Sequence, residues 1–169
     1  MQASCVKLTK SYRSTFEITR FAQGISPDPD LVAIERHGAA PQVVRCRNLA
    51  EENARIGAWL DAFAGSDHHT LAILCKTQKQ AERRFAALRA AGRDVRLLDA
   101  HSRAFARGVI VCTAHLAKGL EFDRVIVPDA SAKNYTTPMD RNLLYVACTR
   151  AMHELVLTYI GERTPFIPQ

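Results

Sequence analysis

Short runs of β-branched and other apolar residues alternate along this chain with longer amphipathic stretches, and this alternation is the strongest constraint on its fold. Such a rhythm is typical of parallel strands joined by crossover helices. Because most of the short runs are apolar at every position, we expect a mostly parallel sheet with helices on both faces. The predicted strands are residues 6–8, 43–46, 71–75, 95–98, 109–113, 124–127 and 155–159.

Helix boundaries are predicted from residues that can satisfy the backbone groups at helix ends. A Ser, Thr or Asn followed three residues later by Glu or Gln favours a helix start, and glycine favours a helix stop. These signals place three starts at Ser14, Asn48 and Thr77 and three stops at Gly24, Gly65 and Gly92. A fourth helix is expected over residues 140–151, with Arg150 projecting from its last turn. The third helix is expected to expose Arg83, Arg84 and Arg89, either as a solvated face or as a patch that contacts phosphate.

Length and composition favour one globular domain over residues 1–169. The hydrophobic fraction of 47% and the charged fraction of 24% are ordinary for such a domain. The sequence has no run of about 18 apolar residues and no signal-peptide core, so we expect a cytoplasmic protein without a membrane partner. The formal charge of +6 favours polyanionic partners without identifying one.

The cysteines and histidines indicate neither a disulfide framework nor a metal site. The five cysteines are an odd number and include no C-x-x-C pair. Cys46, Cys75 and Cys112 lie in apolar runs, where cysteine behaves as a small core residue. His68 and His69 lie in a polar stretch without a neighbouring cysteine or a second histidine pair, so we expect no metal there.

Two blocks in the second half of the chain carry the residues best suited to chemistry. The first reads Thr-Ala-His-Leu-Ala-Lys-Gly-Leu-Glu-Phe at 113–122, and the second reads Arg-Asn-Leu-Leu-Tyr-Val-Ala-Cys-Thr-Arg-Ala at 141–151. Phosphoryl transfer needs cations held beside the oxygens where charge accumulates, and arginine donates to phosphate through a planar fork. Arg150 suits that role, although an arginine near a helix C-terminus is also an ordinary surface residue.

The second block resembles motif VI of UvrD/Rep-type superfamily 1 helicases, and the first looks like motif V of the same family. The resemblance implies that Arg150 acts as an arginine finger on the γ-phosphate of ATP. It also implies that Glu121 contacts the nucleotide ribose, with Gly119 turning the backbone sharply beside the ligand. By the same resemblance, Thr113 and His115 would face a single strand of nucleic acid.

Two shorter similarities extend the match toward the N-terminus. Residues 8–15 are similar to motif IV, which implies that Tyr12 stacks on the adenine and that Arg13 reaches the terminal phosphate. Residues 72–77 resemble the smaller motif that follows, which implies nucleic-acid contacts for Lys76 and Thr77. A core strand followed by a helix cap accounts for Lys76 and Thr77 without any such function.

The resemblance covers nearly the whole chain and implies a RecA-like fold of the P-loop NTPase type, present as the second, C-terminal motor domain. UvrD and Rep carry a large helical insertion before motif V, whereas residues 99–108 leave no room for it here. That short connection is similar to the HelD and helicase IV branch, some of whose members associate with RNA polymerase. The expected partners are therefore an N-terminal RecA-like domain, single-stranded DNA or RNA, and RNA polymerase.

The sequence contains no G-x-x-x-x-G-K-[ST] loop and no Asp-Glu pair at a strand end. We therefore expect ATP to bind between this domain and an N-terminal domain that holds Mg²⁺, and we expect this chain alone, as a fragment, to be inactive. The favoured function is the C-terminal motor domain of an ATP-dependent DNA helicase or translocase. The alternative is a non-enzymatic docking module for nucleic acid or RNA polymerase that retains the motor fold.

Overall fold

The computed structural model describes residues 10–11, 14–27, 32–33, 35–99 and 107–169. The strands are β1 (Lys10–Ser11), β2 (Val32–Ala33), β3 (Gln42–Cys46), β4 (Thr70–Cys75), β5 (Arg96–Leu97), β6 (Gly108–Thr113), β7 (Phe122–Val127) and β8 (Ala151–Ile160). The helices are α1 (Phe16–Ile25), α2 (Leu49–Ala64), α3 (Gln78–Ala90) and α4 (Pro138–Cys148). The strand expected at residues 6–8 lies outside the described residues.

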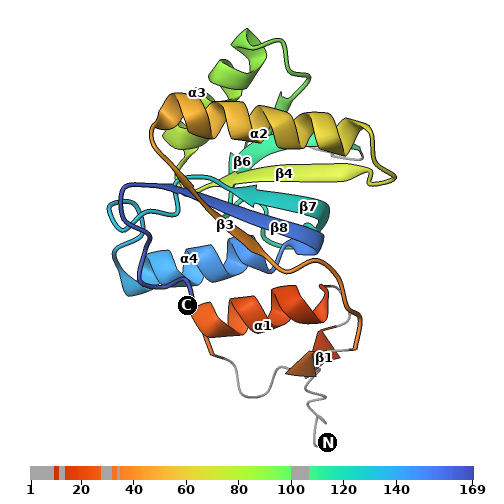
Figure 1. The fold of residues 1–169 in the computed structure, drawn as a ribbon, viewed down its shortest axis with the longest axis vertical. Helices are drawn as coiled ribbons and strands as arrows, with labels where there is room; N and C mark the ends of the chain where they lie inside the picture. Colours follow the sequence, from red (N-terminus) through yellow and green to blue (C-terminus); the bar gives the residue numbers. More distant parts are fainter. Residues whose placement is uncertain (1–9, 12–13, 28–31, 34, 100–106) are drawn as a thin grey trace, which may run out of the picture.

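Six strands form one parallel sheet in the order β3-β8-β7-β4-β6-β5. The α2 and α3 helices cover one face of this sheet, and α1 and α4 cover the other (Figure 1). The predicted α/β class is therefore confirmed. β1 and β2 form a separate parallel pair that was not predicted, because two residues per strand are too few to show a periodic pattern.

The central strand β4 shows why both faces of the sheet need a cover. Its Ala72 and Leu74 join the apolar cluster that includes α1 and α4, whereas Leu71, Ile73 and Cys75 join the cluster on the α2 and α3 side. Each of these side chains is at most 2% exposed. Since successive side chains of a strand point to opposite faces, a run without polar alternation is buried between two layers.

The cysteines predicted to lie in the core are buried. Cys46, Cys75 and Cys112 are each at most 2% exposed. Burial raises the pKa of Cys75 and of Cys112 to about 12, so neither thiol forms a reactive thiolate near neutral pH. Cys75 and Cys112 contribute packing to the two clusters rather than chemistry.

The first helix begins one residue later than predicted. Thr15 is its N-cap instead of Ser14, and the Thr15 hydroxyl accepts a hydrogen bond from the Ile18 amide at 3.5 Å. The Ser14 hydroxyl donates to the Ala151 carbonyl at 2.6 Å, in a buried contact with the start of β8. A tertiary hydrogen bond therefore takes the side chain that the local pattern assigned to the cap.

Two helix ends also differ from the prediction. Gly24 does not stop α1, which continues past it to Ile25. An added Cβ at Gly24 would lie 2.8 Å from the Cβ of Pro168, so the glycine permits Pro168 to approach the helix backbone closely. At the other end of the chain, α4 stops before Thr149, which is its C-cap. Arg150 therefore lies in the turn that leads into β8, not in the last turn of the helix as predicted.

The α4 helix begins at Pro138, two residues before the predicted start, with Thr137 as its N-cap. The caps of α2 and α3 agree with the sequence-based prediction. Asn48 caps α2 through the backbone amide three residues later, and Thr77 and Gln80 form the complete capping box of α3. Gly92 follows α3 with a φ of 76°, a left-handed conformation that glycine adopts without strain. Among the described residues, every helix is too short or too polar to span a bilayer.

Candidate functional site

The site residues predicted from the sequence lie, where the structure describes them, at two opposite edges of the sheet. Glu121 precedes β7 and Arg150 precedes β8, so both lie where those strands begin, at what we call the amino edge. Lys76 follows β4 and Thr113 ends β6, so both lie where those strands end, at the carboxyl edge. Because all six strands run in one direction, the two edges are on opposite sides of the domain.

At the amino edge, the Arg150 side chain is held against nearby backbone and a hydroxyl group. It donates to the Leu120 carbonyl at 3.4 Å, to the Thr149 hydroxyl at 3.3 Å and to the Val146 carbonyl at 3.3 Å. The Arg150 carbonyl accepts a hydrogen bond from the Phe122 amide at 2.9 Å. The two sequence blocks that carry the candidate residues therefore meet at this edge.

Between β6 and β7 the chain crosses from the carboxyl edge back to the amino edge. The crossing starts with a turn, in which the Thr113 hydroxyl accepts from the backbone amide three residues later at 3.2 Å. Ala114 and Ala117 are buried in the cluster on the α1 and α4 side. Near the end of the crossing Gly119 has a φ of 88°, which favours glycine, and the backbone turn delivers Glu121 to the start of β7.

Tyr12 and Arg13, the other two predicted nucleotide contacts, lie outside the described residues. Ser14, the next residue in the chain, is 5% exposed. Its hydrogen bond to Ala151 reaches the residue that directly follows Arg150. The segment that leads into α1 and the turn that carries Arg150 are therefore joined at the amino edge.

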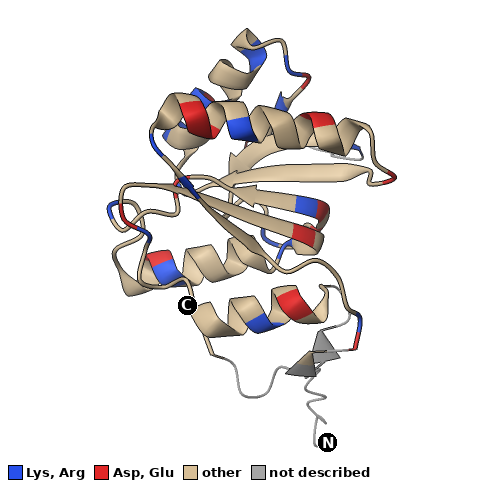
Figure 2. Ribbon diagram, viewed as in Figure 1, with Lys and Arg blue, Asp and Glu red and all other residues tan. Residues whose placement is uncertain are grey.

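A second group of charged residues at the amino edge has no counterpart in the sequence-based prediction (Figure 2). The His153 and His68 rings stack with centroids 5.0 Å apart, and a guanidinium nitrogen of Arg36 lies 2.9 Å from the His153 ring. Arg124 donates to His68 at 2.8 Å and pairs with Glu154 at 3.1 Å. Burial, together with the charges of Arg36 and His68, lowers the pKa of His153. Arg36 and His153 are 117 residues apart, so no local pattern could have indicated their contact.

At the carboxyl edge, Lys76 is bound by the loop that leads into α4. Its Nζ lies 2.8 Å from the Asp140 carboxylate, 2.5 Å from the Asn134 carbonyl and 5.8 Å from the centre of the Tyr135 ring. Burial by itself would raise the pKa of Asp140, but Lys76 and two backbone amides hold that pKa well below its usual value. The Lys76 contacts therefore tie the end of β4 to the first turn of α4.

The four residues predicted to contact a strand differ in how their side chains are used. The Thr113 side chain is buried and caps the turn after β6, and Lys76 is paired with Asp140. Thr77 and His115 are exposed, although the Thr77 hydroxyl also caps α3. Thr77 and His115 are thus the pair with surface available to an incoming ligand.

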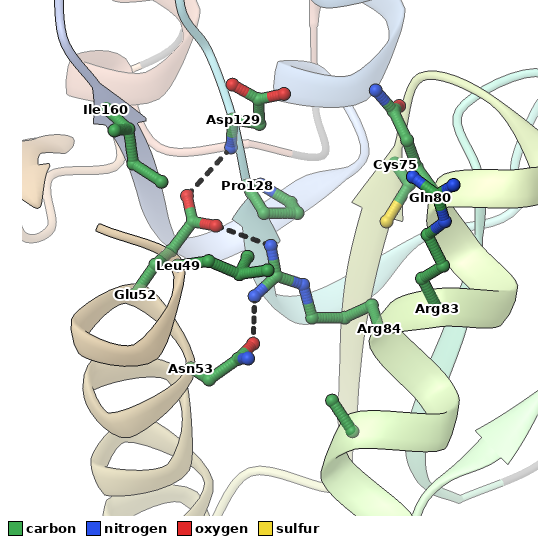
Figure 3. A pocket seen from close by; sticks show the side chains of 11 residues that line it. Leu49, Glu52, Asn53, Cys75, Gln80, Arg83, Arg84, Pro128, Asp129 and Ile160 are labelled. Atoms are coloured by element: carbon green, nitrogen blue, oxygen red, sulfur yellow. Dashed lines mark hydrogen bonds and ion pairs between the residues drawn. The ribbon is translucent and has the colours of Figure 1, made fainter.

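A pocket of about 350 Å³ lies between α2 and α3, at the carboxyl ends of β4 and β7 (Figure 3). Part of its wall is an ion pair between Glu52, which is fully buried, and Arg84, at 2.5 Å. Glu52 also accepts from the Thr158 hydroxyl at 2.6 Å and from the Asp129 amide at 3.0 Å. The prediction that Arg84 lies on an exposed helix face was wrong, because Glu52 supplies the buried partner charge that the local pattern could not reveal.

The position of this pocket follows from the topology of the sheet. The neighbouring strands β4 and β7 are followed by helices on opposite faces, α3 after β4 and α4 after β7 (Figure 1). In open parallel sheets, such a switch point leaves a crevice outside the carboxyl ends of the strands, and ligands bind there. The sequence-based prediction missed the pocket because its residues come from four separate segments of the chain.

Comparison with known proteins places the chain among helicase domains. The family described as the UvrD-like helicase C-terminal domain matches residues 108–158, which contain both sequence blocks. Among solved structures, the chain is similar to the C-terminal domain of a possible DNA helicase from Lactobacillus plantarum WCFS1, with 38% identity and a TM-score of 0.78 over 92% of this chain and 91% of that chain. A complex of the arterivirus nonstructural protein 10 helicase with DNA shows 10% identity and a TM-score of 0.48, covering 88% of this chain and 33% of that chain, and no conclusion rests on it. No curated protein matches the chain.

Proposed function

Because this chain belongs to the family of UvrD-like helicase C-terminal domains, we propose that it is the C-terminal motor domain of an ATP-dependent superfamily 1 DNA helicase or translocase. An N-terminal motor domain would supply the phosphate-binding loop and hold Mg²⁺. The observation that carries the proposal is the division of the candidate residues between two edges. Arg150 and Glu121, matched to nucleotide-contacting motifs, lie at the amino edge, while Thr77 and Thr113, matched to strand-contacting motifs, lie at the carboxyl edge.

The residues at the amino edge suit a nucleoside triphosphate. The contacts of Arg150 described above are to neutral oxygens at 3.3–3.4 Å. Charge-assisted hydrogen bonds from arginine to phosphate are shorter and roughly twice as strong as bonds to neutral oxygens, so a phosphate would compete well with these three contacts. Bound ATP would supply the phosphoryl group that is transferred to water. Arg150 would stabilise the charge on that group, and Glu121 would accept hydrogen bonds from the ribose.

Two further nucleotide contacts are proposed for Tyr12 and Arg13 on the basis of their motif. Tyr12 would stack on the adenine, and Arg13 would act as a second cation toward the terminal phosphate. The buried bond between Ser14 and Ala151 supports this assignment, because it joins the residue after Arg13 to the residue after Arg150.

The position of α4 supports mechanical coupling between the strand contacts at the carboxyl edge and the nucleotide contacts at the amino edge. Its first turn is held at the carboxyl edge by the contact between Asp140 and Lys76, and its C-terminal end leads directly to Arg150 at the amino edge. A helix of 11 residues is about 16 Å long and moves as a rigid rod. A shift of the strand-binding edge would therefore be transmitted to the arginine that contacts phosphate.

These features describe a motor cycle in terms of this domain's own residues. Contact of Arg150 with phosphate draws the domain toward its N-terminal partner, and loss of that contact after hydrolysis releases it. Thr77 and His115, exposed near the carboxyl edge, would grip a DNA strand that crosses both domains. Each closure and opening would then move the grip along the strand by a small step.

The assignment of Arg150 is tested in the helicase that carries both motor domains. Arg150→Ala should reduce ATP turnover by about 10³- to 10⁵-fold, as loss of an arginine finger does, and should leave binding of single-stranded DNA nearly intact. Arg89→Ala is the matched control, because Arg89 is exposed on α3. Unchanged turnover in Arg150→Ala would exclude the finger role, whereas absence of ATP turnover in the unchanged helicase would favour a non-enzymatic docking module that retains the motor fold.

A further inference from the structure

We propose that the pocket between α2 and α3 binds one nucleobase of the single strand. The inference rests on the proposed function, since it requires a strand at the carboxyl edge. The pocket volume of about 350 Å³ lies within the range of small-molecule sites. Thr77, a proposed strand contact, caps the same helix that contributes Gln80, Arg83 and Ala87 to the pocket wall. A base could therefore enter the pocket while its backbone stays at the carboxyl edge.

The charges in the pocket wall favour a neutral ligand over a phosphate. Glu52 and Arg84 neutralise each other at 2.5 Å. Asp129 adds one carboxylate and Arg83 adds one guanidinium, so the four charged side chains of the wall are balanced. Because the wall carries no net charge, it offers no net attraction to offset the cost of removing a phosphate from water, whereas an uncharged base carries no such cost.

Two exposed side chains on different helices line the pocket and offer surface to a flat ring (Figure 3). Leu49, at the start of α2, is 58% exposed although it is a large apolar residue. Arg83, on α3, makes no side-chain hydrogen bond or ion pair with another residue of the described ranges. Pro128 and Ile160 add apolar surface to the wall. Proteins hold unstacked bases against apolar and aromatic side chains and against guanidinium planes, which matches this set.

Polar groups in the pocket can bond the edge of a base. The Asn53 side-chain oxygen accepts from Arg84, which leaves the Asn53 amide nitrogen as a donor. One carboxylate oxygen of Asp129 accepts from the Ser131 hydroxyl at 2.7 Å, which leaves the second as an acceptor. Asp129 also has a φ of 53°, a left-handed conformation that is uncommon outside glycine and that concentrates at ligand sites. A donor and an acceptor are the two kinds of group that the hydrogen-bonding edge of a base requires.

The test compares a strand that has bases with one that lacks them. Fluorescence anisotropy would measure binding of this chain to an oligothymidylate of about 12 nucleotides and to an abasic strand of equal length, at low salt. Ala87→Leu fills the pocket from α3 with a good helix former, and Ala86→Leu, an exposed neighbour outside the pocket, is the matched control. We expect Ala87→Leu to weaken oligothymidylate binding about 10-fold, as loss of one stacked base would, without changing abasic-strand binding. Ala86→Leu should change neither.

A second pair of variants separates the pocket from general charge. Arg83→Gln and Arg89→Gln remove the same charge from the same helix, but only Arg83 lines the pocket. Arg83→Gln should weaken oligothymidylate binding more than abasic binding, and Arg89→Gln should affect both strands equally. Equal losses for both strands in Arg83→Gln and in Ala87→Leu would overturn the pocket assignment while leaving strand binding in place.

The source of the base and the proposed function are tested by two further outcomes. If free thymidine monophosphate binds as tightly as the oligothymidylate and Ala87→Leu abolishes that binding, the ligand is a free nucleotide and the strand assignment is wrong. If the unchanged chain binds neither strand, the failure lies in the proposed strand-binding edge itself, and the base pocket fails with it.

Discussion

Replacing Arg84 with methionine should strongly destabilise the domain, because the change leaves the Glu52 carboxylate buried without its cation. Glu52 is fully buried, Arg84 is 7% exposed, and their charged groups lie 2.5 Å apart. Methionine is a long, flexible and apolar residue, so the variant removes the charge and the donors while retaining much of the packing in this part of α3.

The expected magnitude follows from this burial. Removing one partner of a buried ion pair costs about 3–5 kcal/mol of the free energy of unfolding. Glu52 would keep its hydrogen bonds from Thr158 and from the Asp129 amide, which compensate part of its charge. We therefore expect a loss near the lower end of that range, about 3 kcal/mol. For a chain of this size, such a loss corresponds to a decrease in Tm of about 6–12 °C.

Urea unfolding followed by circular dichroism measures this loss. The matched control is Arg55→Met, because Arg55 is exposed on α2 and pairs with Glu51 at 3.0 Å on the surface, where ion pairs contribute little. An Arg84→Met protein as stable as Arg55→Met would refute the argument that burial makes this pair costly to break. The double variant Glu52→Gln and Arg84→Met should recover part of the loss, since it removes both buried charges and keeps a side-chain oxygen that can accept from Thr158.

Two other contacts lead to measurable effects on stability. The pKa of Asp140 is lower in the folded state than in the unfolded state. Its carboxylate therefore stabilises the fold at pH values above its unfolded pKa of about 3.9. This stabilisation is lost as the pH falls through the lower pKa of the folded state. The unfolding free energy should therefore fall more steeply on acidification in the unchanged protein than in Asp140→Asn, while Asp94→Asn, at an exposed carboxylate, should follow the unchanged protein. Ser14→Ala should lower the unfolding free energy by about 1–2 kcal/mol, because it leaves the buried Ala151 carbonyl without its donor. Urea unfolding measures both effects, and a Ser14→Ala protein of unchanged stability would contradict an anchoring role for this bond.

Local features of the fold could be predicted from the sequence because their causes lie within a few residues of one another. The capping box of α3 joins Thr77 to Gln80, and the apolar run of β4 specifies a strand buried on both faces. The predictions failed where a distant residue changed the outcome. Ser14 has the side chain of a helix cap, yet its hydroxyl bonds Ala151. The sequence pattern of α3 predicts an exposed position for Arg84, yet the buried Glu52 carboxylate pairs with Arg84 and makes its burial possible.

The candidate site residues also fall into two groups, those that a motif could identify and those whose contacts depend on distant residues. Arg150 and Glu121 could be selected from their motifs, and both lie at one edge because both precede parallel strands. The stacked pair of His68 and His153 could not be selected, because its residues belong to separate, unremarkable segments. Lys76 could be chosen as a cation at a strand end, but its bond to Asp140 emerged only in the folded chain.

The sequence by itself determined the alternation of strands and helices, the double-sided cover of the sheet and the order of the motif blocks, because these depend on local periodicity and neighbouring residues. Only the tertiary structure decided which distant residues meet. Contacts such as Ser14 with Ala151, separated by 137 positions, form because the sheet places α1 beside the start of β8. The parallel direction of the strands also decided that the candidate nucleotide and strand contacts lie at opposite edges, a separation that the linear order of residues 113–122 does not contain.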